Sequence, residues 1–309
     1  MSKRRLLLLL KPLDAFVARQ SNSFSRLPDA KVLCHLENRL QVHKDAINFC
    51  QDVLKHKSVT WKQVFRHTLS QPVHDVDLVV TVGGDGTVLR ASHFMDDSIP
   101  ILGVNSDPTQ AEEVNKFDNE FDATRSTGYL CAATVDNFEQ VLDDIFENRA
   151  SPAPVSRMSI SINAQKLPSY ALNDLLIAHP SPAAVSRFSF RLIKDGQPHS
   201  PPVHCRSSGL RVCTAAGSTA AMLSACGFSM PILSRDLQYM VREPISPTAS
   251  SLMHGLVESD RKMKITWSSK EGFLYVDGSH VTYPVQQGDV IEVSLEAPVL
   301  RIYLPRHLL

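Results

Sequence analysis

The residues of this chain best suited to chemistry are the consecutive Gly83, Gly84, Asp85, Gly86 and Thr87, which we call the glycine loop. Three glycines so close together let the backbone turn sharply and approach a ligand without a Cβ in the way. The amides that follow can open a helix, and a helix N-terminus attracts phosphate. A carboxylate at that position would repel phosphate, so a loop that only bound phosphate would not carry one. Its presence is explained if it takes a proton from a neighbouring hydroxyl or holds a metal that bridges phosphates. The loop therefore predicts a phosphate-handling site.

The simpler interpretation of the glycine loop is a turn in which Asp85 caps a helix. Against it, a turn rarely needs three glycines, and residues 76–82 directly before the loop form an apolar run rich in valine. Such a run is typical of a strand that is buried on both faces. The loop matches neither G-x-G-x-x-G nor the P-loop pattern, which requires a lysine. In open α/β sheets, ligands bind at the carboxyl ends of strands, where this loop is expected.

The first half of the chain alternates predicted strands and helices around that loop. Strands are predicted at residues 4–10, 76–82 and 99–105, and helices at 31–56, 86–95 and 134–147. Residues 57–66 fit a strand or a short helix, and residues 13–30 fit a loop. This alternation is typical of a doubly wound α/β sheet.

The second half of the chain has an all-β pattern. After a proline-containing linker at residues 151–154 come short alternating runs at 157–163, 170–177, 186–193, 210–214, 263–267, 273–276 and 290–294. Turn residues such as Asp195-Gly196 and Asp277-Gly278 separate them. We therefore predict an α/β domain at 1–149, which the segment 291–309 can rejoin, and a β-rich domain at 150–290. The cleft between the two domains is the expected substrate site.

Composition narrows the possible partners and compartments. Lys+Arg and Asp+Glu both number 32, so nothing indicates a nucleic-acid or anionic membrane surface. The leucines at 6–10 follow basic residues but form too short a run for a signal peptide, and no stretch could span a bilayer. The six cysteines lack C-x-x-C spacing, which predicts reduced thiols and no metal site. We expect a cytoplasmic protein, with a peroxisomal one as the alternative.

Two stretches of the second half carry polar residues suited to a nucleotide. Asn173 and Asp174, the couplet, would lie on opposite faces of a regular strand unless a bulge turned both to a ligand. Alone, the couplet is better explained as the polar side of an edge strand. Residues 204–221 lead from a strand into small residues, and a helix beginning near Ser218 would gather amides and hydroxyls fit for phosphate or ribose. A close-packed turn of Ala, Ser and Gly is the alternative.

The order and spacing of these three stretches resemble the NAD kinase family over nearly the whole chain. That family pairs a GGDG loop with an Asn-Glu/Asp couplet and a D-G-L-I-V-S-T-P-T-G-S-T-A-Y-like stretch, to which residues 208–221 are similar. Diacylglycerol kinases, sphingosine kinases and 6-phosphofructokinases resemble the chain only in the first motif. Within the family, the chain looks most like the short NADH kinases of plants. The stretches that carry this closer resemblance are residues 97–100, 105–110, 125–128, 233–237 and 240–246.

The resemblance implies a role for each matching residue. Asp85 would be the general base that takes the proton from the adenosine 2′-hydroxyl, and the rest of the glycine loop would surround the transferred phosphoryl group and the pyrophosphates. The residues implied to hold or approach the dinucleotide are Asn173, Asp174, Arg187, Arg206, Ser208, Thr219, Ala220, Ser224 and His280. ATP would be the donor, with Mg²⁺ or another divalent metal to which no side chain is assigned. The family also suggests a homodimer.

Two departures from the family pattern bear on the choice of acceptor. Ser208 stands where the family usually has Asp, and Ala221 where it has Tyr. A carboxylate favours the cationic oxidised nicotinamide over the neutral reduced ring, so Ser208 favours NADH. We therefore predict an ATP-dependent kinase of NADH that also accepts NAD⁺, less well. The alternatives are an NAD⁺-preferring kinase, a lipid kinase, which the second and third motifs disfavour, and a catalytically silent dinucleotide sensor, which Asp85 disfavours.

Overall fold

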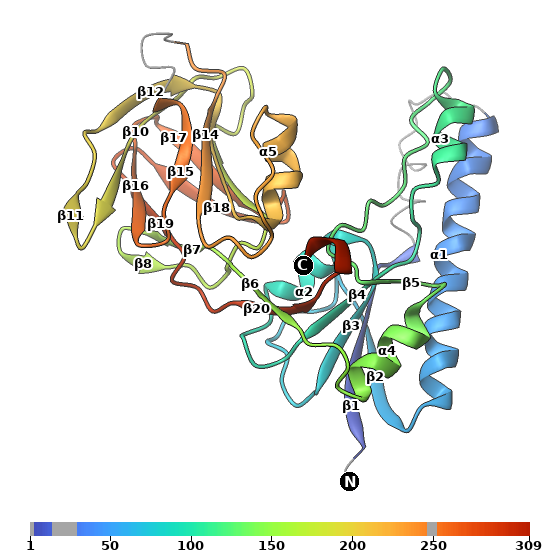
Figure 1. The fold of residues 1–309 in the computed structure, drawn as a ribbon. Coiled ribbons are helices and arrows are strands. Elements are labelled where there is room, and N and C mark those ends of the chain that lie inside the picture. Colours follow the sequence, from blue (N-terminus) through green and yellow to red (C-terminus); the bar gives the residue numbers. More distant parts are fainter. Residues whose placement is uncertain (1–2, 14–29, 246–251) are drawn as a thin grey trace. The chain divides into compact units, whose positions relative to one another are not determined.

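The computed structural model describes residues 3–13, 30–245 and 252–309 and consists of two compact units (Figure 1). The first unit contains residues 1–153 and 301–309, and the second contains residues 154–300. The sequence-based division instead began the returning segment at residue 291, which lies inside a strand of the second unit. The loop predicted at 13–30 falls almost entirely outside the described residues. None of the helices within the described ranges has the length and apolar character needed to cross a membrane.

The first unit is built on a mostly parallel sheet. Its strand order is β2-β1-β3-β4-β20-β6, with β5 paired to β4. The bounds are Arg4–Leu10 (β1), Val59–Phe65 (β2), Leu78–Gly83 (β3), Ile101–Asn105 (β4), Ala133–Thr134 (β5), Ala153–Val155 (β6) and Leu300–Tyr303 (β20). Strand β1 pairs in parallel with β2 and β3, and β4 pairs in parallel with β3, β5 and β20. The predicted α/β class of this part of the chain is confirmed.

Helices cover both faces of this sheet. On one face, α1 (Ala30–His56) and α4 (Phe138–Phe146) share a core with alternate residues of β1, β3 and β4. Ile47, Cys50 and Leu54 of α1 form the buried stripe, at the three- and four-residue spacing of a helix. On the other face lies α2 (Asp85–Ser92), because a Cβ built on Gly103 of β4 would lie 3.1 Å from Val88 Cγ2.

The strand order makes the carboxyl ends of β1 and β3 the topological switch point of the sheet. Strand β1 leads into α1 on one face, and β3 leads into α2 on the opposite face, so the two connections diverge. A crevice forms outside the carboxyl ends of strands at such a point, and ligands of open α/β sheets bind there. The glycine loop follows β3 and therefore lies at this switch point.

Some predicted elements have different bounds in the structure. The helix predicted from residue 134 begins at Phe138, because Thr134 belongs to β5 and its amide donates to Asn137 Oδ1 at 2.8 Å. The segment left open at residues 57–66 is strand β2, and the helix predicted to residue 95 ends at Ser92. Helix α3 (Ala111–Phe117) was not predicted, and it buries no residue. Without a buried stripe, a surface helix leaves no periodic signal in the sequence.

The second unit contains two antiparallel sheets, with orders β11-β10-β16-β19-β7-β8, where β12 pairs with β10, and β15-β14-β13-β9-β17-β18. The first has strands at Ser159–Ile162 (β7), Gln165–Lys166 (β8), Ser186–Lys194 (β10), Gln197–Pro198 (β11), Val203–Ser207 (β12), Arg261–Trp267 (β16) and Val290–Ser294 (β19). The second has strands at Asp174–Ala178 (β9), Gly209–Cys213 (β13), Leu237–Arg242 (β14), His254–Val257 (β15), Glu271–Val276 (β17) and Val281–Gln286 (β18). The predicted β-rich class is confirmed.

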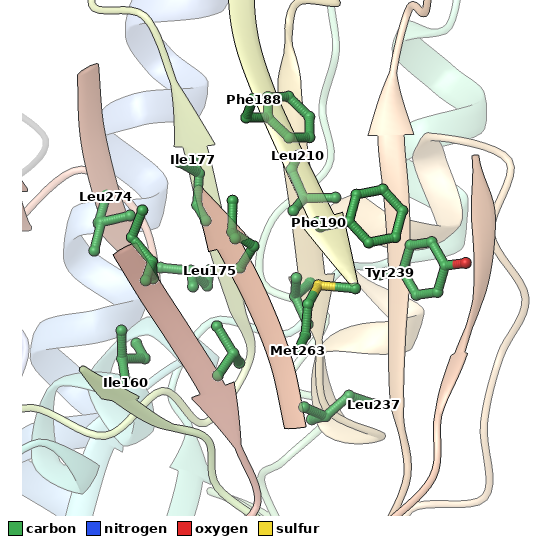
Figure 2. Packing of buried hydrophobic residues seen from close by; sticks show 14 of the residues in the cluster. Ile160, Leu175, Ile177, Phe188, Phe190, Leu210, Leu237, Tyr239, Met263 and Leu274 are labelled. Atoms are coloured by element: carbon green, nitrogen blue, oxygen red, sulfur yellow. The ribbon is translucent and has the colours of Figure 1, made fainter. Parts of the chain in front are cut away.

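The inner faces of these two sheets share one apolar core (Figure 2). Alternate residues of each strand point inward, as in Leu175 and Ile177 of β9 and Phe188 and Phe190 of β10. The ring of Phe190 meets that of Tyr239 edge to face, with centroids 5.2 Å apart. This core fixes β9 and β13, the strands beside which the second set of predicted site residues lies.

Candidate active site

The glycine loop joins the end of β3 to the first turn of α2. Gly83 is the last strand residue, Gly84 is extended, and Asp85 is the first helical residue. A Cβ on Gly83 would lie 2.3 Å from Thr87 Oγ1, and a Cβ on Gly84 would lie 2.1 Å from Ser126 Oγ. The loop can therefore pack this tightly only with glycine at both positions.

The third glycine of the loop has a different environment. Gly86 is exposed, and the nearest atom to a Cβ built on it would be Arg66 Nη1 at 3.6 Å, an ordinary contact distance. Its φ is not in the left-handed region, so the fold alone does not require glycine here. The open space above Gly86 is next to a guanidinium, as expected for a phosphate position.

The carboxylate of Asp85 is held by the backbone of a separate loop. Its Oδ2 accepts a hydrogen bond from the amide of Tyr129 at 2.9 Å, and its Oδ1 accepts one from the amide of Leu130 at 2.8 Å. Cys131 lies beside the same carboxylate, and burial and the charge of Asp85 raise the pKa of its thiol well above its usual value. Each carboxylate oxygen has a second lone pair, so Asp85 can also accept a hydrogen bond from a substrate hydroxyl.

An ion network holds the segment that leads to Tyr129. Arg125 donates through Nη1 to Asp107 at 2.7 Å and through Nε to Glu113 at 2.6 Å. Asp107 also accepts from Arg39 Nε at 2.9 Å, and Asn38 accepts from Arg125 Nη2 at 2.8 Å. The hydrogen bond from Arg125 lowers the pKa of Glu113. Together these contacts tie α1, α3 and the end of β4 to the loop that orients Asp85.

A buried histidine links the ends of β1 and β4 beside the glycine loop. Nε2 of His43 lies 3.0 Å from the carbonyl oxygen of Lys11, and Nδ1 lies 2.7 Å from Ser106 Oγ. Because a carbonyl can only accept, Nε2 carries the proton and Nδ1 accepts from the hydroxyl. Burial lowers the pKa of His43, which favours this neutral form. The amide of Ser106 in turn donates to the carbonyl of Gly83 at 2.8 Å.

In the second unit, the couplet lies where β9 begins and is held by a remote carboxylate. Asp277 Oδ1 accepts from the amides of Asn173 at 2.7 Å and Asp174 at 3.0 Å. Its Oδ2 accepts from the amide of Leu172 at 2.8 Å. On the other side, the amide of Thr214 donates to the carbonyl of Asn173 at 3.0 Å. The backbone of the couplet is thus fixed from β13 and from the turn that follows β17.

The two side chains of the couplet have different environments. Asp174 forms an ion pair with Arg211 of β13, and both side chains are largely buried. Burial raises the pKa of Asp174, an effect that the charge of Arg211 opposes. Asn173 Oδ1 is buried with no hydrogen-bond partner among the described residues. A Cβ on Gly217 would lie 2.1 Å from the carbonyl oxygen of Asn173, so the turn after β13 packs directly on the couplet.

The other predicted dinucleotide residues of the second unit form two groups. The first group belongs to the two segments that contact the couplet through Gly217 and Asp277. It contains Thr219 at the end of the 3₁₀ helix η2 (Ala216–Thr219), Ala220, Ser224 at the end of α5 (Ala221–Ser224) and the exposed His280 in the turn that begins at Asp277. The other group contains Arg187, Arg206 and Ser208. The helix predicted to begin near Ser218 is thus a 3₁₀ turn followed by a single α-helical turn.

Arg187 and Arg206 lie directly opposite each other on the antiparallel strands β10 and β12. Both are exposed on the face of the sheet away from the core, and neither has an ion-pair partner in the described ranges. Like charges in directly opposite positions destabilise a sheet by themselves. An anion bound by both guanidinium groups would offset that repulsion, so the pair suits phosphate.

Ser208 lies at the bend between β12 and β13. Its amide and its hydroxyl both donate to the carbonyl oxygen of Arg242, at 3.0 and 3.3 Å. Because the regular strand β13 lies between them, at about 3.3 Å per residue, Ser208 and Thr214, the partner of Asn173, are roughly 20 Å apart. The structure therefore does not bring Ser208 together with the couplet.

The groups that hold these residues in place were not predicted from the sequence. The amides of Tyr129 and Leu130 carry no sequence signal, because every non-proline residue has one. Arg211 leaves a signal, since it is a charge within the otherwise apolar residues of β13. Asp277 was recognised only as part of a turn, although it accepts three backbone hydrogen bonds.

Comparisons with known proteins agree with this architecture. The family described as ATP-NAD kinase N-terminal domain matches residues 6–108. The chain is 52% identical to the probable NADH kinase of Oryza sativa subsp. japonica, over 100% of this chain and 99% of that protein. It is 59% identical to the NADH kinase of Arabidopsis thaliana, over 98% of this chain and 96% of that protein.

A solved structure extends the comparison to the fold. The NAD kinase from Archaeoglobus fulgidus in complex with ATP superimposes with a TM-score of 0.66 and 20% identity, over 98% of this chain and 95% of that one. The arrangement of a mostly parallel sheet, with a glycine loop at its switch point, followed by a β-rich unit is thus the fold of that solved protein. The sequence identities of 52% and 59% to the two plant proteins, over nearly the full chain, establish the family: the chain belongs to the NAD kinase family.

Proposed function

We propose that this chain is an ATP-dependent kinase that phosphorylates the adenosine 2′-hydroxyl of NADH to give NADPH, and that of NAD⁺ less efficiently. The observation that carries the proposal is the identity of 52% and 59%, over nearly the full chain, to two plant proteins named as NADH kinases. The glycine loop at the switch point of the parallel sheet supports it, since that is where ligands of such sheets bind.

Asp85 is the proposed general base. The amides of Tyr129 and Leu130 fix the carboxylate, and its other lone pairs take the proton of the 2′-hydroxyl. The 2′-oxygen then bonds the γ-phosphorus, the bond from that phosphorus to the bridging oxygen breaks, and ADP leaves with the electron pair. Because phosphoryl transfer needs mainly positioning and charge stabilisation, a carboxylate of fixed orientation suits it.

The rest of the glycine loop is proposed to surround the transferred group. Backbone amides at the start of α2, which begins at Asp85, are proposed to donate to a phosphate oxygen, as at other helix N-termini. Gly86 leaves the approach open, whereas Thr87 is fully buried and shapes the loop by packing against Gly83.

The dinucleotide is proposed to contact the second unit at both groups of residues. Thr219, Ala220, Ser224 and His280 are proposed to contact the dinucleotide, since their exposed or half-buried side chains suit contacts to ribose or base. Arg187 and Arg206 suit a phosphate, and Ser208 is proposed to influence the choice between oxidised and reduced nicotinamide.

ATP is the proposed donor, and the related Archaeoglobus fulgidus enzyme was solved in complex with ATP. The divalent metal, with Mg²⁺ as the expected ion, is proposed to be held mainly through the phosphates, as is usual for Mg²⁺ in kinases. No group of three or more His, Cys, Asp or Glu residues in the described ranges is arranged to hold a metal ion. When bound, the metal would neutralise charge that develops on the phosphates.

Compartment and assembly are also proposals. All six cysteines lie in the described ranges and are free thiols, which supports a reducing compartment, and we propose the cytoplasm. We propose a homodimer on the basis of the family resemblance. Light scattering of the purified protein tests the assembly, and a monomeric mass over the working concentration range would contradict it.

The decisive test of function is a steady-state assay of the purified chain with ATP, Mg²⁺ and either NADH or NAD⁺. We expect NADPH to form with a higher kcat/KM than NADP⁺. A higher value for NAD⁺ would make the chain an NAD⁺-preferring kinase. Dinucleotide binding without turnover of either acceptor would instead identify a sensor.

A further inference from the structure

Two cations flank the glycine loop at the carboxyl edge of the first unit's sheet. Lys11 directly follows β1, and its amide donates to the carbonyl of Val82 in β3 at 3.0 Å. Arg66 directly follows β2, and its amide donates to the carbonyl of Leu10 at 2.8 Å. Since β2, β1 and β3 are adjacent parallel strands, both residues lie at the edge of the sheet from which the glycine loop emerges.

Both residues contact the positions that the loop glycines leave open, Lys11 through its Cβ and Arg66 through its guanidinium. Lys11 Cβ would be 3.1 Å from a Cβ built on Gly83, and Arg66 Nη1 would be 3.6 Å from one built on Gly86. Both side chains are half-buried, which costs hydration of their charges. Burial, followed by the positive charges of Arg39 and Arg66, lowers the pKa of Lys11 to about 8.

Burial and neighbouring positive charges disfavour the charged form of both cations. Burial and the charge of Arg90 also lower the pKa of Arg66, so each cation is destabilised by its surroundings. Of the acidic residues, Asp107 opposes the effect on Lys11, but it also pairs with Arg39 and Arg125. A bound polyphosphate would place negative charge beside both cations and favour their charged forms.

We propose that Lys11 and Arg66 bind the triphosphate of the ATP donor, beside the amides that open α2. The inference rests on the proposed kinase function and names donor-binding residues outside the glycine loop. The loop lacks the lysine that a P-loop carries in its own sequence, and Lys11 supplies such a charge from the neighbouring strand β1. Arg66 supplies the planar guanidinium that suits two phosphate oxygens at once.

The role of Lys11 predicts a pH dependence for ATP binding. The ammonium faces Arg39 and His43 of α1, Arg66 after β2 and Asp107 after β4. It is protonated below about pH 8 and loses its charge above it. In the free protein, one pH unit above that value leaves about a tenth of the molecules charged, so apparent ATP affinity should fall by up to about tenfold.

The test uses the full chain and measures donor and acceptor binding separately. The variants Lys11→Met and Arg66→Gln each remove a charge, and Lys11→Arg keeps one that does not titrate in this range. Lys62→Met is the matched control, because it removes an exposed charge from β2. Calorimetry gives the affinity for the non-hydrolysable analogue AMP-PNP with Mg²⁺ and, separately, for NADH. Thermal unfolding confirms that each variant is folded.

We expect Lys11→Met and Arg66→Gln each to weaken AMP-PNP binding by about tenfold or more, with NADH affinity nearly unchanged. Lys62→Met should match the parent. The parent should lose AMP-PNP affinity between about pH 7 and about pH 9, whereas Lys11→Arg should not.

Several results would overturn the assignment. These are unchanged AMP-PNP affinity in both charge-removing variants, a loss confined to NADH, or a parent that does not bind AMP-PNP. Failure of the proposed function has a different signature, in which the parent binds AMP-PNP with the expected variant effects but does not phosphorylate NADH.

Discussion

The two sets of site residues use the same interaction in opposite senses. In the first unit, the site residue Asp85 is itself the carboxylate, and it accepts hydrogen bonds from the amides of Tyr129 and Leu130. In the second unit, the site residues Asn173 and Asp174 supply the amides, and the remote Asp277 accepts them. A substitution at Asp85 therefore removes both chemistry and an anchor. A substitution at Asp277 removes only an anchor.

The largest expected effect is on catalysis in the first unit. Asp85→Asn should lower kcat by about 10² to 10⁴, because an amide cannot take the proton of the 2′-hydroxyl. It should also leave one of the two amides of the 129–130 loop facing the new NH₂ group, at a cost of about 1–3 kcal/mol in stability. Steady-state kinetics and denaturant unfolding measure the two effects separately.

Asp97→Asn is the control for Asp85→Asn, because Asp97 is an exposed acid of the same unit. It should change neither kcat nor the free energy of unfolding. If Asp85→Asn kept kcat within a few-fold of the parent, Asp85 would not be the base, whatever its effect on stability.

The next prediction compares a glycine that packing requires, in the second unit, with one in the first unit that packing does not require. Gly217→Ala places a methyl group 2.1 Å from the carbonyl oxygen of Asn173, which is backbone and cannot rotate away. We expect a loss of up to about 3 kcal/mol in stability and weaker NADH binding. Gly86→Ala has room and should leave the free energy of unfolding within about 1 kcal/mol of the parent. Equal unfolding free energies for the two variants would contradict the packing argument.

The third prediction separates anchoring from chemistry in the second unit. Asp277→Asn has one acceptor oxygen for three amides, so at least one amide loses its partner, at about 2 kcal/mol. Because the couplet is then less well oriented, we expect KM for NADH to rise while kcat changes little. A fall in kcat with unchanged KM would contradict an anchoring role.

Asp289→Asn is the matched control in the same unit. Asp289 accepts from the amide of Gln286 at 2.7 Å and from Asn163 Nδ2 at 2.8 Å, in a turn that carries no predicted site residue. We expect a comparable loss of stability with an unchanged KM for NADH.

This comparison also explains what the sequence could predict. The strand, the glycine loop and helix α2 are contiguous, so their residue types and spacing indicated both the phosphate site and the α/β fold. The couplet was recognised, but its supports Arg211 and Asp277 lie 37 and 103 residues from Asp174. Which strands become neighbours, and in what register, is set by packing of the whole unit, and no local pattern encodes it.

The smaller elements were missed for a related reason. Helix α3 buries no side chain, and β8 and β11 contain two residues each, so none of them has a periodic pattern to detect. The opposed pair Arg187 and Arg206 was carried over only from a family resemblance. Their direct pairing became visible only when β10 and β12 were placed side by side.

The smallest expected effect concerns the choice of acceptor at Ser208. A carboxylate about 4 Å from a cationic nicotinamide, at an effective dielectric of about 20, would be attracted by about 4 kcal/mol. Desolvation of the carboxylate removes much of that gain, and a net value of about 1.4 kcal/mol still changes preference tenfold. We therefore expect Ser208→Asp to move the ratio of kcat/KM for NADH and NAD⁺ toward NAD⁺ by about tenfold or less.

Shape and charge must be separated in this test, because Ser208 also has a structural role. Its hydroxyl donates to the carbonyl of Arg242, and an aspartate cannot replace that hydrogen bond. Ser208→Asn has nearly the shape of the aspartate without its charge, so it should leave the ratio near that of the parent. If both variants shift the ratio equally, the cause is geometry and not the nicotinamide charge. If neither shifts it, the preference for NADH arises elsewhere in the second unit, and Ser208 serves only the bend between β12 and β13.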